Sequence, residues 1–330
     1  MNSQIKVSFI VPAYNEVDNV FPFYETFSKT FADSNLLWEL IFIDDGSSDG
    51  TRGKLRELTI NKPNVLAISF SRNFGKEAAI WAGLNNATGD IIGIIDADLQ
   101  QDPQDALNMV NALLDNDDCD MVAAFQAHRH EGRLLSFLKR SFYSLMDSMM
   151  ETPVLKDASD FRVFRRCVAD TILSMPEFHR FSKGIFSWVG FNTMPYAYEP
   201  LERQHGVSKW SLFKLLQYAF SGIISFSTKP LRAASWLGIS LSILSFIYFL
   251  VVMVQKTMFS IPIPGYATLI CLILLIGGVQ LLFLGIAGEY IGRTYIQVKS
   301  RPIYIESKRF QSQNIEHKHY QECEKSSSEQ

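Results

Sequence analysis

The stretch Ile91-Ile92-Gly93-Ile94-Ile95-Asp96-Ala97-Asp98-Leu99-Gln100 runs from an apolar strand directly into two carboxylates. Carboxylates this close at the end of a buried strand repel each other unless a cation lies nearby. Carboxylate oxygens, completed by diphosphate oxygens, are the ligands that Mg²⁺ or Mn²⁺ prefers. The stretch therefore predicts a sheet strand that ends in a metal and diphosphate site.

Four further apolar runs of strand length recur in the first half of the chain: Val7–Val11, Leu37–Ile43, Val65–Phe70 and Asp120–Phe125. The segments between them are long enough for helices. Strands that alternate with helices are typical of a mostly parallel sheet covered on both faces. We therefore predict an α/β domain over residues 1–209.

Polar clusters follow the predicted strands: P-A-Y-N-E at 12–16, D-D-G-S-S-D-G at 44–50 and S-R-N-F-G-K at 71–76. Each cluster alone is compatible with an ordinary turn or helix cap. Ligands of such sheets bind beyond the carboxyl ends of the strands, so the convergence of the clusters favours a binding site. The sequence contains neither a P-loop nor a G-x-G-x-x-G fingerprint, so a nucleotide is expected to be held by another device.

Composition excludes several classes of protein. The chain has 330 residues, of which 47% are hydrophobic and 20% charged, a more apolar balance than in most soluble domains. A net charge of −3 provides no basic field, so no nucleic-acid partner is expected. The four cysteines are widely spaced, which indicates neither zinc nor disulfides and fits a reducing compartment. The first residues lack the features of a signal peptide, so we expect the N-terminal part in the cytosol.

Two long uncharged stretches lie near the C-terminus. Ala233 to Gln255 comprises 23 residues and Thr257 to Gly288 comprises 32. Each is long enough to cross about 30 Å of hydrocarbon as a helix. A buried hairpin in a soluble core is the alternative, but core hairpins are rarely so long and so uniformly apolar. We predict transmembrane helices at 231–256 and 264–290.

Basic residues flank these predicted spans unequally. The connection between them carries Lys256 alone, whereas the outer flanks carry Lys209, Lys214, Lys229, Arg232, Arg293, Lys299, Arg301, Lys308 and Arg309. This asymmetry predicts that both termini are cytosolic. Residues 210–230 are predicted as interfacial juxtamembrane helices, with a helix packed on the globular domain as the alternative. Residues 291–330 are predicted as a cytosolic tail, disordered from about Glu306.

The motifs P-A-Y-N-E, D-D-G-S-S-D-G-T, R-N-F-G-K and D-A-D-L-Q, in this order and spacing, resemble family 2 glycosyltransferases of the polyprenyl-phosphate hexosyltransferase branch. That branch includes dolichol-phosphate mannose synthase and bacterial bactoprenol glucosyltransferases. The resemblance covers residues 5 to about 210, and the two spans are similar to those of the bacterial members. It implies a GT-A (nucleotide-diphosphosugar transferase) domain, followed by juxtamembrane helices and two transmembrane helices.

The resemblance also implies roles for individual residues. The nucleotide would be held by Pro12, Tyr14, Glu16, Asp44, Asp96 and Ala97, and the Mg²⁺ or Mn²⁺ ion by Asp98, Gln100 and Asp96. The implied catalytic residues are Asp98, Asp160, Arg203 and Lys209. Arg203 and Lys209 lie in R-Q-H-G-V-S-K, which matches the R-x-x-G-x-S-K element of the family, and their alternative role is attraction to anionic lipid. The roles of Arg72 and Lys76 stay open.

The expected acceptor is a polyprenyl phosphate, because a phosphate is mostly dianionic at neutral pH and needs no strong general base. The metal, Arg203 and Lys209 would neutralise the leaving diphosphate, while Asp160 would orient acceptor or sugar. Arg129, Arg133 and Arg140 are candidates for the acceptor phosphate, although they also suit the solvated face of an amphipathic helix. One direct displacement would invert the anomeric centre.

The expected reaction transfers a hexose from a UDP-sugar to undecaprenyl phosphate in the plasma membrane. Glucose is favoured, with N-acetylglucosamine and galactose as alternatives. A processive polysaccharide synthase would be expected to carry more spans and a Q-x-x-R-W motif. A non-catalytic scaffold would be expected to have lost D-x-D or the pair Arg203 and Lys209.

The expected partners are the bilayer, the two substrates and further copies of the chain, with a tetramer as one arrangement. Close contacts between helices of different copies are favoured by small residues in the second span, namely Gly277, Gly278, Gly285 and Gly288.

Overall fold

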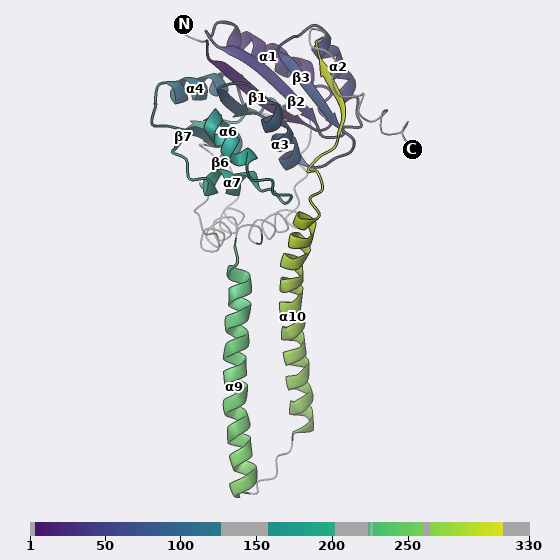
Figure 1. The fold of residues 1–330 in the computed structure, drawn as a ribbon, viewed down its shortest axis with the longest axis vertical. Coiled ribbons are helices and arrows are strands. Elements are labelled where there is room, and N and C mark those ends of the chain that lie inside the picture. Colours follow the sequence, from purple (N-terminus) through teal and green to yellow (C-terminus); the bar gives the residue numbers. More distant parts are fainter. Residues whose placement is uncertain (1–3, 127–157, 202–223, 225–226, 260–264, 313–330) are drawn as a thin grey trace, which may run out of the picture. The chain divides into compact units, whose positions relative to one another are not determined.

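The computed structural model describes residues 4–126, 158–201, 224, 227–259 and 265–312 (Figure 1). These residues divide into two compact units. Of the described residues, the first unit contains 4–126, 158–201 and 302–312, and the second contains 224, 227–259 and 265–301. Each unit is described by itself below.

The first unit is built on one eight-stranded sheet with the order β7-β5-β6-β4-β1-β2-β3-β8. The strands are β1 (Lys6–Ala13), β2 (Leu37–Asp44), β3 (Val65–Phe70), β4 (Ile91–Ile94), β5 (Met121–Gln126), β6 (Ala158–Arg165), β7 (Thr193–Tyr198) and β8 (Glu306–Gln311). β1 to β4 are mutually parallel, β7 is parallel to β5, and β6 and β8 run antiparallel to their neighbours. The prediction of a mostly parallel sheet is confirmed.

Helices cover both faces of this sheet (Figure 1). They are α1 (Val20–Ala32), α2 (Thr51–Ile60), α3 (Lys76–Asn86), α4 (Pro103–Leu114), α6 (Arg166–Leu173) and α7 (Ser182–Trp188). Successive residues of β1 point to opposite faces, as the pleat requires. Phe9 packs edge-on against Phe27 of α1, with ring centroids 5.0 Å apart, while Ile10 faces α3 at Gly83. A Cβ atom at Gly83 would lie 2.2 Å from Ile10, so a small residue there lets α3 pack closely on β1.

β8 corrects the prediction for the C-terminal region. Disorder was expected from about Glu306, but Glu306–Gln311 forms an edge strand hydrogen-bonded to β3. A polar strand suits this place, because one edge of such a strand and much of its side-chain surface remain in water. The pairing also covers the edge of β3, which would otherwise be open. Residues 313–330 lie outside the described residues.

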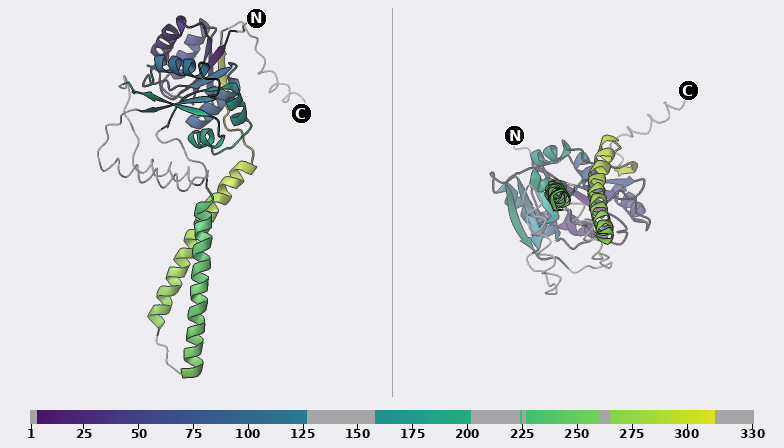
Figure 2. Two further views of the ribbon diagram at one scale, coloured as in Figure 1. Left: turned by 90° about the vertical axis from the view of Figure 1, so that its left-hand side faces the viewer. Right: turned by 90° about the horizontal axis from the view of Figure 1, so that it is seen from below.

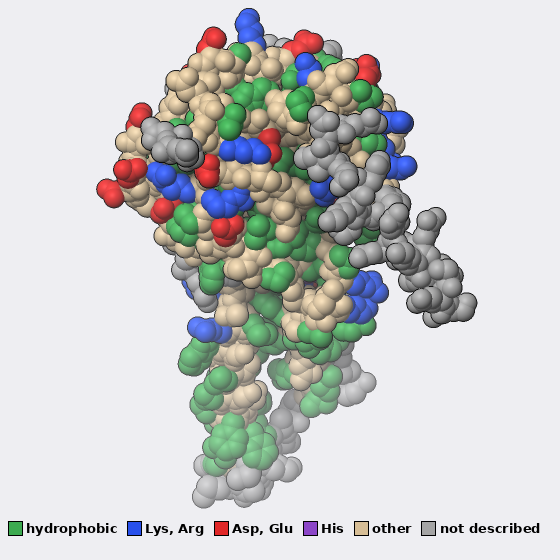
Figure 3. Space-filling view, turned by 45° about the horizontal axis from the view of Figure 1, so that its top comes forward, with side chains coloured by type: hydrophobic (Ala, Val, Ile, Leu, Met, Phe, Trp, Pro, Cys, Tyr) green, Lys and Arg blue, Asp and Glu red, His purple; other side chains and the backbone are tan. Residues whose placement is uncertain are grey.

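The second unit contains two long helices, α9 (Lys229–Phe259) and α10 (Tyr266–Val298), each longer than the predicted span. The segments Lys229–Val252 and Leu275–Val298 are apolar enough to cross a membrane, and neither is buried within the protein. Each has 24 residues, which corresponds to about 36 Å of helix at 1.5 Å per residue. Large side chains such as Leu244, Phe246 and Leu281 are exposed along them. Figure 3 shows apolar side chains along these helices, whereas the first unit mixes acidic and basic side chains on its surface. Most of the predicted juxtamembrane region at 210–230 lies outside the described residues.

A second view (Figure 2) shows the chain passing from the end of α10 into β8. The sequence of the first unit is therefore interrupted by the helical hairpin. Its sheet is completed only after α10 has been made.

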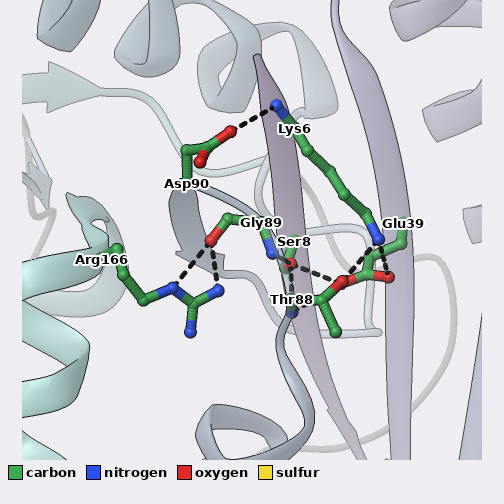
Figure 4. A network of polar contacts seen from close by, with 7 residues as sticks. All are labelled: Lys6, Ser8, Glu39, Thr88, Gly89, Asp90 and Arg166. Atoms are coloured by element: carbon green, nitrogen blue, oxygen red, sulfur yellow. Dashed lines mark hydrogen bonds and ion pairs between the residues drawn. The ribbon is translucent and has the colours of Figure 1, made fainter. Parts of the chain in front are cut away.

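A polar network joins the amino ends of β1 and β4 to β2 (Figure 4). Its centre is the Glu39 carboxylate, which pairs with Lys6 Nζ at 2.7 Å and accepts hydrogen bonds from Ser8 Oγ at 2.6 Å and the Thr88 N–H at 2.9 Å. The Gly89 N–H donates to Ser8 Oγ at 2.7 Å. A Cβ atom at Gly89 would lie 2.7 Å from the Lys6 carbonyl oxygen, so only glycine fits there. This network holds together the amino ends of β1, β2 and β4, and the polar clusters follow the carboxyl ends of these strands.

We expect Glu39→Gln to lower the free energy of unfolding by about 1–3 kcal/mol near neutral pH. Burial opposes ionisation of Glu39, but Lys6, Ser8 and Thr88 outweigh it and lower its pKa below the ordinary value of 4.5. A carboxyl whose pKa is lower in the folded state stabilises the fold above its unfolded pKa, and this contribution is lost as pH falls through the folded value. The difference between wild type and variant should therefore shrink on acidification, as measured by thermal unfolding of the detergent-purified protein. Glu57→Gln, on the exposed side of α2, is the control; a difference that does not change with pH would contradict the prediction.

Candidate active site

The loops that follow β1 and β2 are hydrogen-bonded to each other. The Asn15 N–H donates to Ser47 Oγ at 2.9 Å, and the Ser48 N–H donates to Asn15 Oδ1 at 3.0 Å. The Glu16 N–H donates to Thr51 Oγ1 at 2.9 Å. Three of the residues predicted to bind the nucleotide, Pro12, Tyr14 and Glu16, are thus held beside the end of β2.

Tyr14 is the most accessible residue of the predicted nucleotide group, with 50% of its surface exposed. Its neighbour Asn15 has φ of 57°, a left-handed conformation that asparagine tolerates better than most residues. The tight turn at Asn15 thus leaves the Tyr14 ring exposed just after the carboxyl end of β1. A ring in such a position can stack on a planar base.

Asp44 and Asp45 have different tasks, although both are buried. Asp44 accepts a hydrogen bond from the Ser47 N–H at 2.9 Å and pairs with Arg52 Nε at 3.4 Å. Its carboxylate is fully enclosed, so in this structure it shapes its own turn, and its predicted nucleotide contact stays a prediction.

Asp45, which the sequence did not single out, ties the loop after β3 to β2. Its two oxygens accept hydrogen bonds from the Phe74 N–H at 2.6 Å and the Gly75 N–H at 2.9 Å. Gly46 lies where the loop after β2 packs closely on the loop after β3. Its φ is +69°, and a Cβ atom would lie 2.4 Å from the Arg72 carbonyl carbon. The doublet of aspartates followed by glycine is the only sign of this arrangement in the sequence.

The segment after β4 forms a compact turn around Asp96. Gln101 Oε1 accepts a hydrogen bond from the Asp96 N–H at 2.9 Å, and Gln101 Nε2 donates to Asp96 Oδ2 at 3.3 Å. The Gln100 N–H donates to Asp98 Oδ1 at 3.2 Å, and Leu99 has φ of 58°. Gln101 is buried and was not predicted as a site residue. Its amide orients the first carboxylate of the D-x-D pair.

Lys76 joins two of the predicted carboxylates. Its Nζ atom lies 2.6 Å from Asp96 Oδ1 and 3.1 Å from Asp160 Oδ2. Lys76 is the first residue of α3, Asp96 follows β4, and Asp160 lies near the start of β6. Because β6 runs antiparallel to β4, its start lies beside the end of β4. The three side chains remain 39%, 30% and 25% exposed, in the order Lys76, Asp96, Asp160, so the cluster is open to a ligand.

The charges of Lys76 and Asp160 are stabilised by their surroundings. Burial disfavours the Lys76 cation, but Asp96 and Asp160 outweigh it and raise the pKa of Lys76. Burial likewise opposes ionisation of Asp160, but Lys76, Lys183 and Arg162 together lower the pKa of Asp160 to about 2. Both groups are therefore charged throughout the neutral range. The arrangement is suited to electrostatic binding rather than to proton transfer.

A buried layer supports the cluster from below. Burial lowers the pKa of Arg162 to about 10, although Asp160 and Glu77 oppose this. The Arg162 guanidinium lies 4.0 Å from the centre of the Phe186 ring and donates to the Ser159 carbonyl at 2.9 Å. It therefore remains a fixed cation behind Asp160.

Glu77, next to Lys76, links α3 to α7. Its carboxylate accepts hydrogen bonds from the N–H and the hydroxyl of Ser182, the first residue of α7. Burial raises the pKa of Glu77, and these bonds oppose the rise. The start of α3 is thus held at two places: Glu77 bonds it to Ser182 of α7, and Asp45 bonds the loop that precedes it.

The residues present fit a divalent ion in one respect. Asp98 and Gln100 supply hard oxygen atoms beside the strand end, and Mg²⁺ is usually bound by one or two carboxylates with phosphate and water oxygens. Asp96 Oδ1 pairs with Lys76 and Asp96 Oδ2 accepts a hydrogen bond from Gln101. Asp98 stays a predicted ligand of the ion. In the described part of the chain, no three His, Cys, Asp or Glu side chains gather as a complete metal site.

Five predicted site residues lie outside the described residues: Arg129, Arg133, Arg140, Arg203 and Lys209. The structure brings together Asp96 and Asp160 through Lys76, and Ala97, Asp98 and Gln100 lie in the turn that follows Asp96. It adds Lys76, Asp45 and Gln101, which the sequence pattern left unassigned or unnoticed.

Comparisons with known proteins find similarities over most of the chain. The model of the family "Glycosyl transferase family 2" matches residues 8–173, and that of the "GtrB C-terminal hairpin" matches residues 229–294. The chain is 39% identical over 304 residues to the bactoprenol glucosyl transferase of Shigella phage SfII, covering 91% of this chain and 97% of that protein. It is also 39% identical over 304 residues to the prophage bactoprenol glucosyl transferase homolog of Escherichia coli K12, covering 91% of this chain and 98% of the homolog. Among solved structures, mannosyl-3-phosphoglycerate synthase from Rubrobacter xylanophilus aligns with a TM-score of 0.48 and 18% identity, over 66% of this chain and 71% of that one.

Proposed function

The chain belongs to glycosyl transferase family 2, and from this premise we propose that it transfers glucose from UDP-glucose to undecaprenyl phosphate. It is a membrane-anchored glycosyltransferase that carries the GtrB-type hairpin. The names of its relatives support a polyprenyl phosphate as acceptor and glucose as the sugar. The product would be a lipid-linked phosphosugar used to modify cell-envelope glycans.

The observation that carries this proposal is the cluster of Lys76, Asp96 and Asp160 at the strand ends. Lys76 and Asp160 are stabilised in their charged forms, and Asp160 is too weak a base to deprotonate a sugar hydroxyl near neutral pH. A phosphate monoester needs no such base, because it is already mostly dianionic. An anionic acceptor therefore suits this site better than a hydroxyl acceptor.

The proposed reaction is one displacement. A phosphate oxygen of the lipid attacks the anomeric carbon, a new C–O bond forms, and the bond to the UDP oxygen breaks with its electron pair leaving on the diphosphate. The configuration inverts, which gives a β-linked product from an α-linked donor. A divalent ion, when bound, supplies positive charge to the diphosphate.

The residues of the chain provide binding and orientation in this proposal. Tyr14, Glu16 and Pro12 are proposed to bind the nucleoside, and Asp98 with Gln100 to hold the ion. Lys76 supplies a fixed cation next to the D-x-D pair. Arg203 and Lys209 are proposed for the leaving diphosphate, and Arg129, Arg133 and Arg140 for the acceptor phosphate.

We further propose that the hairpin anchors the enzyme in the plasma membrane with both termini in the cytosol. The basic residues outside the spans support this orientation. Assembly into a homo-oligomer is proposed from the small residues on α10.

A panel of radiolabelled UDP-sugars tests the proposal. We expect the detergent-purified protein to move label from UDP-glucose into the lipid phase when undecaprenyl phosphate and Mg²⁺ or Mn²⁺ are present, and not when the lipid is omitted. Label from UDP-N-acetylglucosamine or UDP-galactose instead would keep the reaction and change the sugar. A folded protein that transfers label from none of the donors would favour a non-catalytic scaffold.

A further inference from the structure

The segment that follows α10 pairs with the strand that leads to Lys76. β8 runs antiparallel to β3, from the pair Leu66 and Gln311 to the pair Phe70 and Glu306. The Ser71 N–H then donates to the Ile305 carbonyl at 3.0 Å. The pairing thus continues one residue beyond β3, into the loop 71–75 that ends at Lys76.

An aromatic stack reinforces this contact. The Tyr304 ring stacks on Phe70, with centroids 4.8 Å apart and an angle of 22° between the planes. Phe70 is fully buried and meets Phe74 edge-on, with centroids 5.7 Å apart. The Arg72 guanidinium lies 3.9 Å from the centre of the Phe74 ring. Tyr304 therefore supports the loop through Phe70.

The same segment also contacts the far end of α3. Arg309 Nη2 donates to Asn86 Oδ1 at 2.8 Å, and the Glu306 carboxylate holds Arg309 at 2.9 and 3.1 Å. Asn86 is the last residue of α3 and Lys76 is the first. The post-hairpin segment thus fixes the helix at one end and its preceding loop at the other.

We propose that Tyr304 is a positioning residue of the transferase: through Phe70 and Phe74 it holds loop 71–75 and so sets the place of Lys76 between Asp96 and Asp160. Asp45 pins the same loop from β2 by its bonds to the Phe74 and Gly75 N–H groups. In the described part of the chain, loss of the stack would leave the backbone bond from Ser71 to Ile305 as the remaining contact between the post-hairpin segment and this loop. A displacement of about 1 Å at a catalytic group costs on the order of 100-fold in rate. The activity readout of this inference rests on the proposed function.

The test compares variants of the full chain in detergent. Tyr304→Ala removes the ring, Tyr304→Leu keeps apolar volume without the stack, and Tyr304→Phe keeps the ring. Lys308→Ala, an exposed position on the same strand, is the matched control. Each change is made in wild type and in Lys76→Met, so that a double-mutant cycle reports whether Tyr304 acts through Lys76.

We expect Tyr304→Ala and Tyr304→Leu to lower kcat about tenfold or more. The kcat of Tyr304→Phe and of Lys308→Ala should stay within about twofold of wild type. In the Lys76→Met background, Tyr304→Ala should change kcat by less than about twofold. If Tyr304→Ala does not fold, Tyr304→Leu decides. Full activity of the folded Tyr304→Ala or Tyr304→Leu variant would overturn the inference. So would a decrease in kcat by the same factor in wild type and in Lys76→Met.

A second readout separates this inference from the proposed function. If wild type transfers no label, the proposed function has failed, and the cycle is repeated on binding of UDP in the presence of Mn²⁺. The positioning role would still be supported if Tyr304→Ala weakened UDP binding in the wild-type background but had no effect on UDP binding in the Lys76→Met background. UDP affinity that is unchanged in Tyr304→Ala, or absent in wild type, would overturn it.

Discussion

Lys76→Met is expected to lower kcat/KM for lipid glycosylation about 100-fold or more, equivalent to about 2.7 kcal/mol of transition-state stabilisation. The side chain of methionine matches lysine in length but carries no charge. Without the ammonium group, the Asp96 and Asp160 carboxylates would lose the cation that both of them contact, and the incoming diphosphate would meet more negative charge. Both effects disfavour a site that must gather negative charge.

The dependence of the Lys76 variants on pH provides a second criterion. In wild type, Asp160 is ionised far below neutral pH, so it should produce no acid limb between about pH 5 and 8. In Lys76→Met, the largest interaction that lowers the Asp160 pKa is gone, so its protonation should move toward that range. Lys54→Met, an exposed lysine on α2, is the control. Initial rates across pH would contradict the prediction if Lys76→Met matched the control.

Asp98→Asn is expected to reduce transfer by about 100-fold or more at a concentration of Mg²⁺ or Mn²⁺ that only half-saturates the wild-type enzyme. The amide keeps the shape and one oxygen but loses the charge that attracts a divalent ion. The bond from the Gln100 N–H to Asp98 Oδ1 can still form with the amide oxygen, so the turn should persist.

A titration of rate against metal concentration measures this effect. The Asp98→Asn curve should shift to higher concentration, whereas Asp117→Asn, at a carboxylate that is fully exposed, should follow wild type. An Asp98→Asn enzyme with the wild-type curve would remove Asp98 from the proposed metal site. Chelation of wild type should abolish transfer, and added metal should restore it.

The first sheet strands could be predicted because each is a short apolar run followed by turn residues. β3 has the bounds Val65–Phe70 that the sequence predicts, and β1, β2 and β4 differ by a few residues at their ends. The hairpin could be predicted because its apolar length exceeds what a soluble core usually accommodates. The edge strand β8 could not, since Glu306–Gln311 is polar and gains its structure only from the open edge of β3.

The candidate site was predicted as far as its carboxylates. Asp96 and Asp98 stand out because charges directly follow an apolar strand, but nothing local links Lys76 to Asp160. Their contact depends on β6 running antiparallel to β4, a feature of topology rather than of sequence pattern. Asp45 and Gln101 were missed for a related reason. Their side chains bond to backbone and carboxylate groups whose positions follow only from the folded loops.

The place of β8 has a consequence for biosynthesis. The ribosome must synthesise both hairpin helices before the strand that covers β3, so the sheet cannot close until the membrane segment has been made. Until then the nascent domain carries an open edge, which is a site for unwanted pairing with other chains. A chain truncated after residue 228 would retain that edge permanently. The order of synthesis would thus make the last strand a checkpoint: the domain is completed only in chains that have already produced their anchor.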